Sequence, residues 1–110
     1  KKVKEKAVDT ANKYAIDIPM ETAEKCFRVI ELTNTLVEKG NPNSVSDAGV
    51  AAEMALAGVR GACMNVLINL PGIQDQTYRD EKRSAVEDLI QKAESLHQAV
   101  YGKTIKVIHD

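Results

Sequence analysis

Apolar residues recur along most of the chain at the three- and four-residue spacing of amphipathic helices, and no segment alternates at every second residue as a half-buried strand would. The first such segment runs from Val3 to Ala15, and the second begins at Pro19 and ends at Gly40, a residue type that often terminates helices. Because the residue before a proline disfavours the helical conformation, we expect a break at residues 16–18 between two separate helices.

The third segment follows a turn of loop-forming residues, Asn41 to Ser44. It should form a helix from Val45 to Leu70, with Ser44 or Ser46 as its N-cap and with Pro71 following its end. A fourth helix should begin at Asp75 and end at Gly102. The pattern therefore predicts an all-α helical bundle of four helices, without an internal repeat or a low-complexity linker.

The third segment differs from the others because apolar or small residues surround most of its circumference, so we expect it to be packed on almost every side. At 100° per residue, one strip about 80° wide holds only small and polar residues. The strip is compatible with close helix packing and also with a ligand surface. Its two carboxamides favour a ligand surface, because buried amides need hydrogen-bond partners. The residues of this small strip are Asp47, Ala51, Ala55, Gly58, Ala62, Asn65 and Asn69.

Composition restricts the function further. The 110 residues suffice for one small domain, and 15 basic against 16 acidic residues disfavour a nucleic-acid binder. No run of 18 apolar residues predicts a membrane span. Cys26 and Cys63 are expected to be free thiols in a reducing cytosol. His97 and His109 lack ligand-spaced partners, so no metal site is expected.

Three stretches together resemble a known family: Gly40 to Ala52, Gly58 to Ala62, and Asn65 to Leu70. They are similar to the cyclodeaminase/cyclohydrolase family of folate enzymes. The resemblance implies an all-helical, dimeric domain about twice as long as this chain, of which residues 1–110 would form the C-terminal part. A glycine-rich stretch of the family's N-terminal helices is absent here.

The resemblance also implies a cytoplasmic lyase of one-carbon metabolism and histidine degradation, with no cofactor. Its reaction would convert 5-formimidoyltetrahydrofolate to 5,10-methenyltetrahydrofolate with release of ammonia. A homodimer or larger homo-oligomer and a fused or adjacent formiminotransferase domain would be its partners, with no nucleic acid and no membrane. Two alternatives remain open: a hydrolytic 5,10-methenyltetrahydrofolate cyclohydrolase, and a non-catalytic helical dimerisation module.

The candidate site residues lie at the two ends of the third segment. Asp47 is the candidate catalytic residue, because a carboxylate there can move a proton or stabilise a cation. Asn65 and Asn69 are candidates to bind polar atoms of the folate. The polar groups at the start of the segment complete the candidate substrate-binding set, namely Asn41, Asn43 and Ser46.

Overall fold

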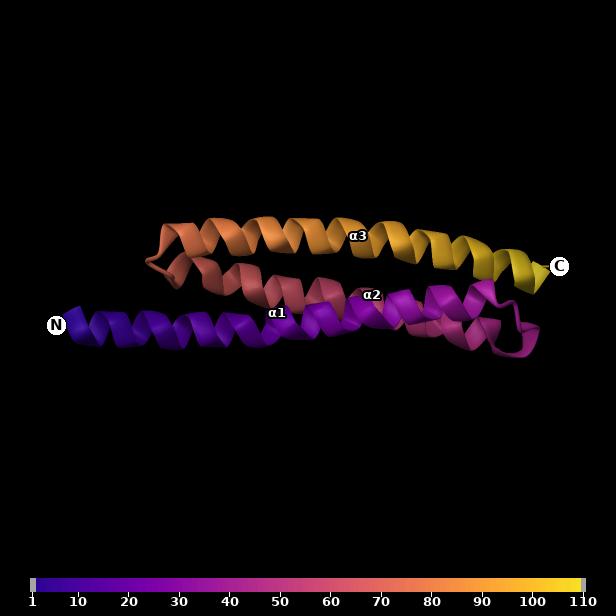
Figure 1. The fold of residues 1–110 in the computed structure, drawn as a ribbon, viewed down its shortest axis with the longest axis horizontal. Helices are drawn as coiled ribbons and strands as arrows, with labels where there is room; N and C mark the ends of the chain where they lie inside the picture. The colour runs from indigo at the N-terminus through magenta and orange to yellow at the C-terminus, as the bar shows by residue number, and fades with distance from the viewer. Residues whose placement is uncertain (1, 110) are drawn as a thin grey trace.

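The computed structural model describes residues 2–109 as three long helices joined by short connections (Figure 1). The helices are α1 (Lys2–Glu38), α2 (Pro42–Asn69) and α3 (Gln76–His109), and a short 3-10 helix, η1 (Leu70–Gly72), continues from α2. Neighbouring helices run in opposite directions and form a rod of 66 × 18 × 17 Å. Residues 2–109 contain no strand, so the prediction of an all-α bundle is confirmed.

The core lies where the apolar stripes of the three helices meet. α1 and α3 each contact α2 and also contact one another, so α2 is covered from two directions. The inward positions expected for the third segment are buried, and those of the fourth are buried or half-buried. The expectation is wrong for the first segment, where the apolar positions from Val3 to Ala15 are exposed. The fully buried larger side chains are Ile16, Ile30, Val45, Val59, Cys63, Val66, Leu70, Ile73, Val86 and Val100.

The expected break before Pro19 is wrong, because α1 passes through this proline without interruption. Proline within a helix removes one backbone hydrogen bond and costs about 3 kcal/mol or more. Ile16 and Met20 flank it and are almost completely buried, and each such side chain contributes about 1.5–3 kcal/mol. Burial on both sides of Pro19 therefore offsets the local penalty, and two expected helices become one.

The end of α1 and the start of α2 depend on local chemistry. Gly40 has a φ of 70°, a left-handed conformation that glycine adopts without strain, so the expected stop is confirmed. α2 begins at Pro42, three residues before the expected start, and its N-cap is Asn41 rather than Ser44 or Ser46. The Asn41 side chain accepts a hydrogen bond from the backbone N–H of Asn43 at 3.0 Å, and proline suits the first helical position.

The fourth expected helix is α3, and only its beginning is as expected. Asp75 precedes it and its Oδ1 accepts a hydrogen bond from the backbone N–H of Tyr78 at 3.1 Å. The expected end at Gly102 is wrong, because α3 continues to His109. Val100 and Thr104 are buried on either side of Gly102 and hold the helix against the bundle.

α2 is not covered on every side by residues 2–109. The face opposite its buried stripe is exposed, and its side chains include Met54 and Ile68, with exposed fractions of 71% and 77%. We call this stripe the open face of α2. Its residues are Val50, Met54, Ala57, Gly61, Met64 and Ile68.

By length and composition alone, residues Pro42–Gly72 would also satisfy the criteria for a membrane-spanning helix. However, Glu53 and Arg60 interrupt the apolar surface: Arg60 forms an ion pair with Glu94 of α3, and Glu53 contacts His97 of α3. The opposite stripe is buried against α1 and α3. These contacts are typical of the core helix of a helical bundle. Such a core helix satisfies the same length and composition criteria as a membrane-spanning helix.

Candidate functional site

The polar residues at the beginning of α2 form an exposed cluster. Asn41 and Asn43 are linked by the cap hydrogen bond, and the Ser44 hydroxyl donates to the carbonyl of Asn41 at 3.4 Å. Asp47 lies in the next turn and is exposed, and so is Ser46. The structure thus brings Asn41, Asn43, Ser46 and Asp47 to one end of the bundle, as the sequence indicated.

Ser46 also borders a hollow between α2 and α3. The hollow has a volume of about 190 Å³, and its walls are mostly apolar, with Val50, Ile105 and Ile108 among them. Tyr101 and Glu53 also line it. The open face of α2 therefore continues into this hollow at Val50.

Asn65 and Asn69 lie at the other end of α2, where they line a groove of about 360 Å³ against α1. Pro19 and Thr22 are on the opposite wall of the groove. Both asparagines are exposed, so the expectation that they are buried carboxamides is wrong. The Asn69 side-chain amide donates a hydrogen bond to the backbone carbonyl of Asn65 at 2.8 Å.

Close packing occupies the middle of the small strip. Ala55 and Ala62 are buried, and a Cβ atom at Gly58 would lie 2.6 Å from the Sγ atom of Cys26 on α1. Cys26 and Cys63 are both free thiols, and burial raises the pKa of the Cys63 thiol. The two interpretations of the strip therefore apply to different parts of it: its middle is a packing surface, and only its ends are open to ligands.

The two polar ends are far apart within one copy of the chain. At the rise of an α-helix, Asp47 and Asn65 are separated by about 27 Å along α2. This distance exceeds the reach of any one side chain. One copy of the chain thus holds two separate halves of the expected site.

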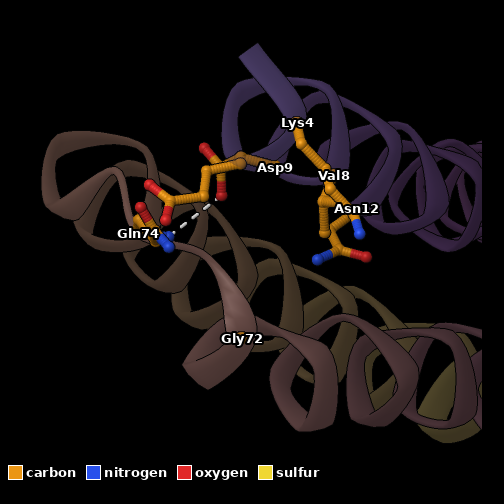
Figure 2. A pocket seen from close by; sticks show the side chains of 7 residues that line it. Lys4, Val8, Asp9, Asn12, Gly72 and Gln74 are labelled. Atoms are coloured by element: carbon orange, nitrogen blue, oxygen red, sulfur yellow. Dashed lines mark hydrogen bonds between the residues drawn. The ribbon is translucent and has the colours of Figure 1, made fainter. Parts of the chain in front are cut away.

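Sequence reasoning missed a polar cluster at the end of the bundle away from Asp47. There the start of α1 meets the link between α2 and α3. Figure 2 shows Lys4, Asp9 and Asn12 from α1 around a pocket of about 180 Å³, with Gln74 opposite. The dashed line is the hydrogen bond from the Gln74 backbone N–H to Asp9 Oδ1, at 3.0 Å. The pocket is lined by residues from both sides of this junction.

Lys13 and Tyr78 extend this cluster. Lys13 forms an ion pair with Asp75 at 3.0 Å, and this hydrogen bond raises the pKa of the lysine. The pKa of Asp75 is lowered, first by the hydrogen bond from the Tyr78 N–H and then by Lys13. The Tyr78 hydroxyl donates to Asp17 at 2.8 Å, and the pKa of Tyr78 is raised by burial and then by this carboxylate.

This cluster has a structural explanation. The four-residue spacing of Asp9, Lys13 and Asp17 places them on one side of α1, and this spacing is the sequence signal that identifies them. Apart from the ion pair between Asp9 and Lys13 within α1, their hydrogen bonds and ion pairs reach the link before α3 or its first turns. The cluster therefore fastens α3 to α1.

A second pair of polar contacts joins α2 to α3. Arg60 forms an ion pair with Glu94 at 2.5 Å, and Glu53 Oε1 lies 2.7 Å from Nε2 of His97. The second contact is close but lacks the geometry of a hydrogen bond. Both Glu53 and Arg60 remain about half exposed on the flank of the open face.

Comparison with known proteins identifies the family of this chain. The family model described as formiminotransferase-cyclodeaminase matches residues 1–88 of the chain. The match includes α1, α2 and the beginning of α3, and therefore both polar ends of α2. The chain belongs to the formiminotransferase-cyclodeaminase family.

Curated relatives agree with this assignment. The chain is 38% identical over 99 residues to methenyltetrahydrofolate cyclohydrolase from Methylorubrum extorquens, a match that covers 90% of this chain and 47% of the relative. Formimidoyltransferase-cyclodeaminase from Rattus norvegicus is 31% identical over 96 residues, which are 87% of this chain and 18% of that protein. The Gallus gallus protein of the same name is 33% identical over 87 residues, which are 79% of this chain and 16% of that protein. The chain spans less than half the length of these relatives.

Proposed function

We propose that this chain contributes to a folate one-carbon enzyme that converts 5-formimidoyltetrahydrofolate to 5,10-methenyltetrahydrofolate and releases ammonia. The observation that carries the proposal is the family match, which spans both polar ends of α2. The relatives from Rattus norvegicus and Gallus gallus bear names that pair a formimidoyltransferase with a cyclodeaminase. A formiminotransferase domain would then supply the substrate of this reaction.

The proposed chemistry requires positioning and proton transfer. N10 of the folate attacks the formimidoyl carbon and forms a new C–N bond, and N10 loses its proton. The bond from this carbon to the former imino nitrogen then breaks, and that nitrogen leaves as ammonia after protonation. Holding N10 next to the carbon supplies the effective concentration, and a nearby carboxylate can accept and return the proton.

Under this proposal Asp47 is the proton-handling residue. It is exposed at the start of α2, so a substrate can approach it. Asn65 and Asn69 line the groove beside α1, about 27 Å from Asp47 along α2, where their exposed side chains can bind other polar atoms of the folate. Asn41, Asn43 and Ser46 add amide and hydroxyl groups around Asp47.

A second candidate is the hydrolytic 5,10-methenyltetrahydrofolate cyclohydrolase. The observation in its favour is the 38% identity to the Methylorubrum extorquens enzyme of that name. In this reaction water, instead of N10, attacks the bridging carbon, and a carboxylate at Asp47 would accept its proton. The bond from this carbon to N5 then breaks as N5 is protonated, which leaves a formyl group on N10. Both candidates use the same site and differ in the substrate supplied.

One experiment separates them. The purified protein is incubated with 5-formimidoyltetrahydrofolate or with 5,10-methenyltetrahydrofolate, while methenyltetrahydrofolate absorbance and ammonia are followed together. A cyclodeaminase gives equal amounts of methenyltetrahydrofolate and ammonia from the first substrate. A cyclohydrolase only accelerates the loss of methenyltetrahydrofolate absorbance. If neither substrate is converted faster than in buffer, the enzymatic proposal is wrong and a helical dimerisation module remains.

A further inference from the structure

We propose that the hollow between α2 and α3 binds the pterin rings of the folate, with the Glu53 carboxylate on their aminopyrimidine edge and Tyr101 against one face. The shape and charge of the hollow favour a flat heterocycle that carries N–H donors. That this heterocycle is the pterin of the substrate rests on the function proposed above.

The hollow is a small apolar site between two helices of this chain. α2 contributes Gly49 and Val50 to its walls, and the last turns of α3 contribute Ile105 and Ile108. Gly49 has no side chain to fill the space, and it approaches Thr104 so closely that an added Cβ atom would lie 2.6 Å from Cγ2. The volume of about 190 Å³ is below the roughly 300–1,000 Å³ of pockets that enclose a drug-sized ligand. The hollow therefore suits one ring system rather than a whole folate.

Glu53 gives this apolar hollow a negative charge. Among the described residues that line it, Glu53 alone is charged at neutral pH. Its Oε1 lies 2.7 Å from Nε2 of His97, and half of the Glu53 side chain, 51%, remains exposed. A carboxylate next to apolar walls binds most strongly to a ligand that presents N–H donors, because hydrogen bonds to a charged acceptor are the stronger ones.

Of the parts of a folate, the pterin fits this arrangement best. Its aminopyrimidine edge presents the 2-amino group and the N3–H side by side, and a carboxylate can accept hydrogen bonds from both. The aminobenzoyl ring has no such pair of donors. The glutamate end is negatively charged, so the Glu53 carboxylate repels it. The charge in the hollow therefore selects the pterin end of the substrate.

Tyr101 adds an aromatic surface beside Glu53. Its side chain lines the hollow and is 53% exposed. On α3 its ring is stacked with that of His97, with the centroids 6.3 Å apart and an angle of 27° between the planes. Because aromatic rings favour offset-stacked and edge-to-face contacts, a flat heterocycle gains more from Tyr101 than an aliphatic ligand of the same size does.

This placement brings the reacting atoms to the candidate catalytic residue. Ser46 lines the hollow, and Asp47 follows it. At the rise of an α-helix, Asp47 lies about 9 Å from Glu53 along α2. The pterin with its adjoining methylene group spans about this distance, so N10 reaches the Ser46 end when the aminopyrimidine edge is at Glu53. Asn65 lies about 18 Å from Glu53 in the other direction, beyond the reach of the pterin.

Binding of simple pteridines tests the site without turnover. Pterin is fluorescent, so its titration with the purified protein gives a dissociation constant. Lumazine, in which an oxo group replaces the 2-amino group, is the matched probe. We expect the parent to bind pterin about 10–100-fold more tightly than lumazine, because hydrogen bonds to a charged group are lost. Glu53→Gln should weaken pterin binding by a similar factor without weakening that of lumazine.

Matched variants serve as controls. Glu94→Gln removes a carboxylate that pairs with Arg60 between the same two helices but outside the hollow. Tyr14→Leu removes an exposed tyrosine from α1. Both should bind pterin as the parent does, whereas Tyr101→Leu should bind it about 5-fold more weakly or worse, because it loses the aromatic surface. Circular dichroism verifies that all the variants are helical.

The outcomes separate this site from the proposed function. The pterin site is overturned if the parent binds pterin no more tightly than lumazine, or if Asn65→Ala rather than Glu53→Gln weakens pterin binding. It is also overturned if the parent converts folate and Glu53→Gln leaves both pterin binding and the KM for folate unchanged, and the function then stands. If pterin binding depends on Glu53 and Tyr101 as expected but no folate is converted, the site stands and the proposed reaction is wrong.

Discussion

The close approach of α2 to α3 provides a sharp test of the bundle. A Cβ atom at Gly49 would lie 2.6 Å from Cγ2 and 3.1 Å from Oγ1 of Thr104. Thr104 is buried and its hydroxyl donates to the carbonyl of Val100 at 2.8 Å, so it cannot rotate away without losing this hydrogen bond. We therefore expect Gly49→Ala to destabilise the chain.

The expected change in the free energy of unfolding for Gly49→Ala is the balance of two effects. Replacing a helical glycine by alanine stabilises a helix by about 0.5–1 kcal/mol, because the unfolded chain loses less entropy. Overpacking a filled contact costs about 1–3 kcal/mol. The free energy of unfolding should therefore fall by a net amount of about 1 kcal/mol. Thr104→Ala removes the two shortest of these contacts and leaves the Cβ atom of residue 104 at 3.3 Å, so Gly49→Ala should then be neutral or stabilising.

Urea unfolding followed by circular dichroism measures this double-mutant cycle. Gly102→Ala is the matched control, because Gly102 lies inside α3 and an added Cβ would meet nothing within 4 Å. It should stabilise the chain by about 0.5–1 kcal/mol. If Gly49→Ala is as stabilising as Gly102→Ala in the parent chain, α2 and α3 do not approach as closely as described. If Gly102→Ala has no effect, the continuation of α3 to His109 is in doubt.

Further predictions concern the two polar regions. Asp47→Asn should lower turnover by about 10²–10⁴-fold in the absorbance assay, with little change in melting temperature, and near-normal turnover would exclude Asp47 as the proton carrier. Tyr78→Phe should cost about 1 kcal/mol in urea unfolding, because its hydroxyl donates to Asp17; an unchanged midpoint would show that the bond contributes nothing. The pKa of Asp75 is lowered in the folded chain, so its stabilising effect is present above the ordinary carboxyl range and is lost as the pH falls through the folded value. The melting temperature of the parent chain should therefore fall in acid, and that of Asp75→Asn should fall less steeply. If the two chains show parallel dependence of melting temperature on pH, Asp75 is not the stabilising group.

The fold class and most inward faces could be predicted from the sequence. Helical periodicity depends only on which residues are apolar, and it identified the buried stripe of α2 and most of that of α3. In the first segment it failed, because the apolar positions from Val3 to Ala15 are exposed. The stop at Gly40 and the start after Asp75 were also predictable, because a left-handed glycine and an aspartate cap act through their own backbone and nearest neighbours. The stretches in α2 on which the resemblance rests belong to the part of the chain that the family model matches.

Other features depended on tertiary contacts. Pro19 and Gly102 are unfavourable within a helix by local rules, yet α1 and α3 continue through them, because buried neighbours on both sides contribute more than the local penalty. Periodicity also shows that a face of α2 is apolar but not which surface covers it. Only the packed bundle revealed that α1 and α3 bury one side of α2 and leave the other exposed, and that the polar groups at the two ends of α2 cannot meet within one copy.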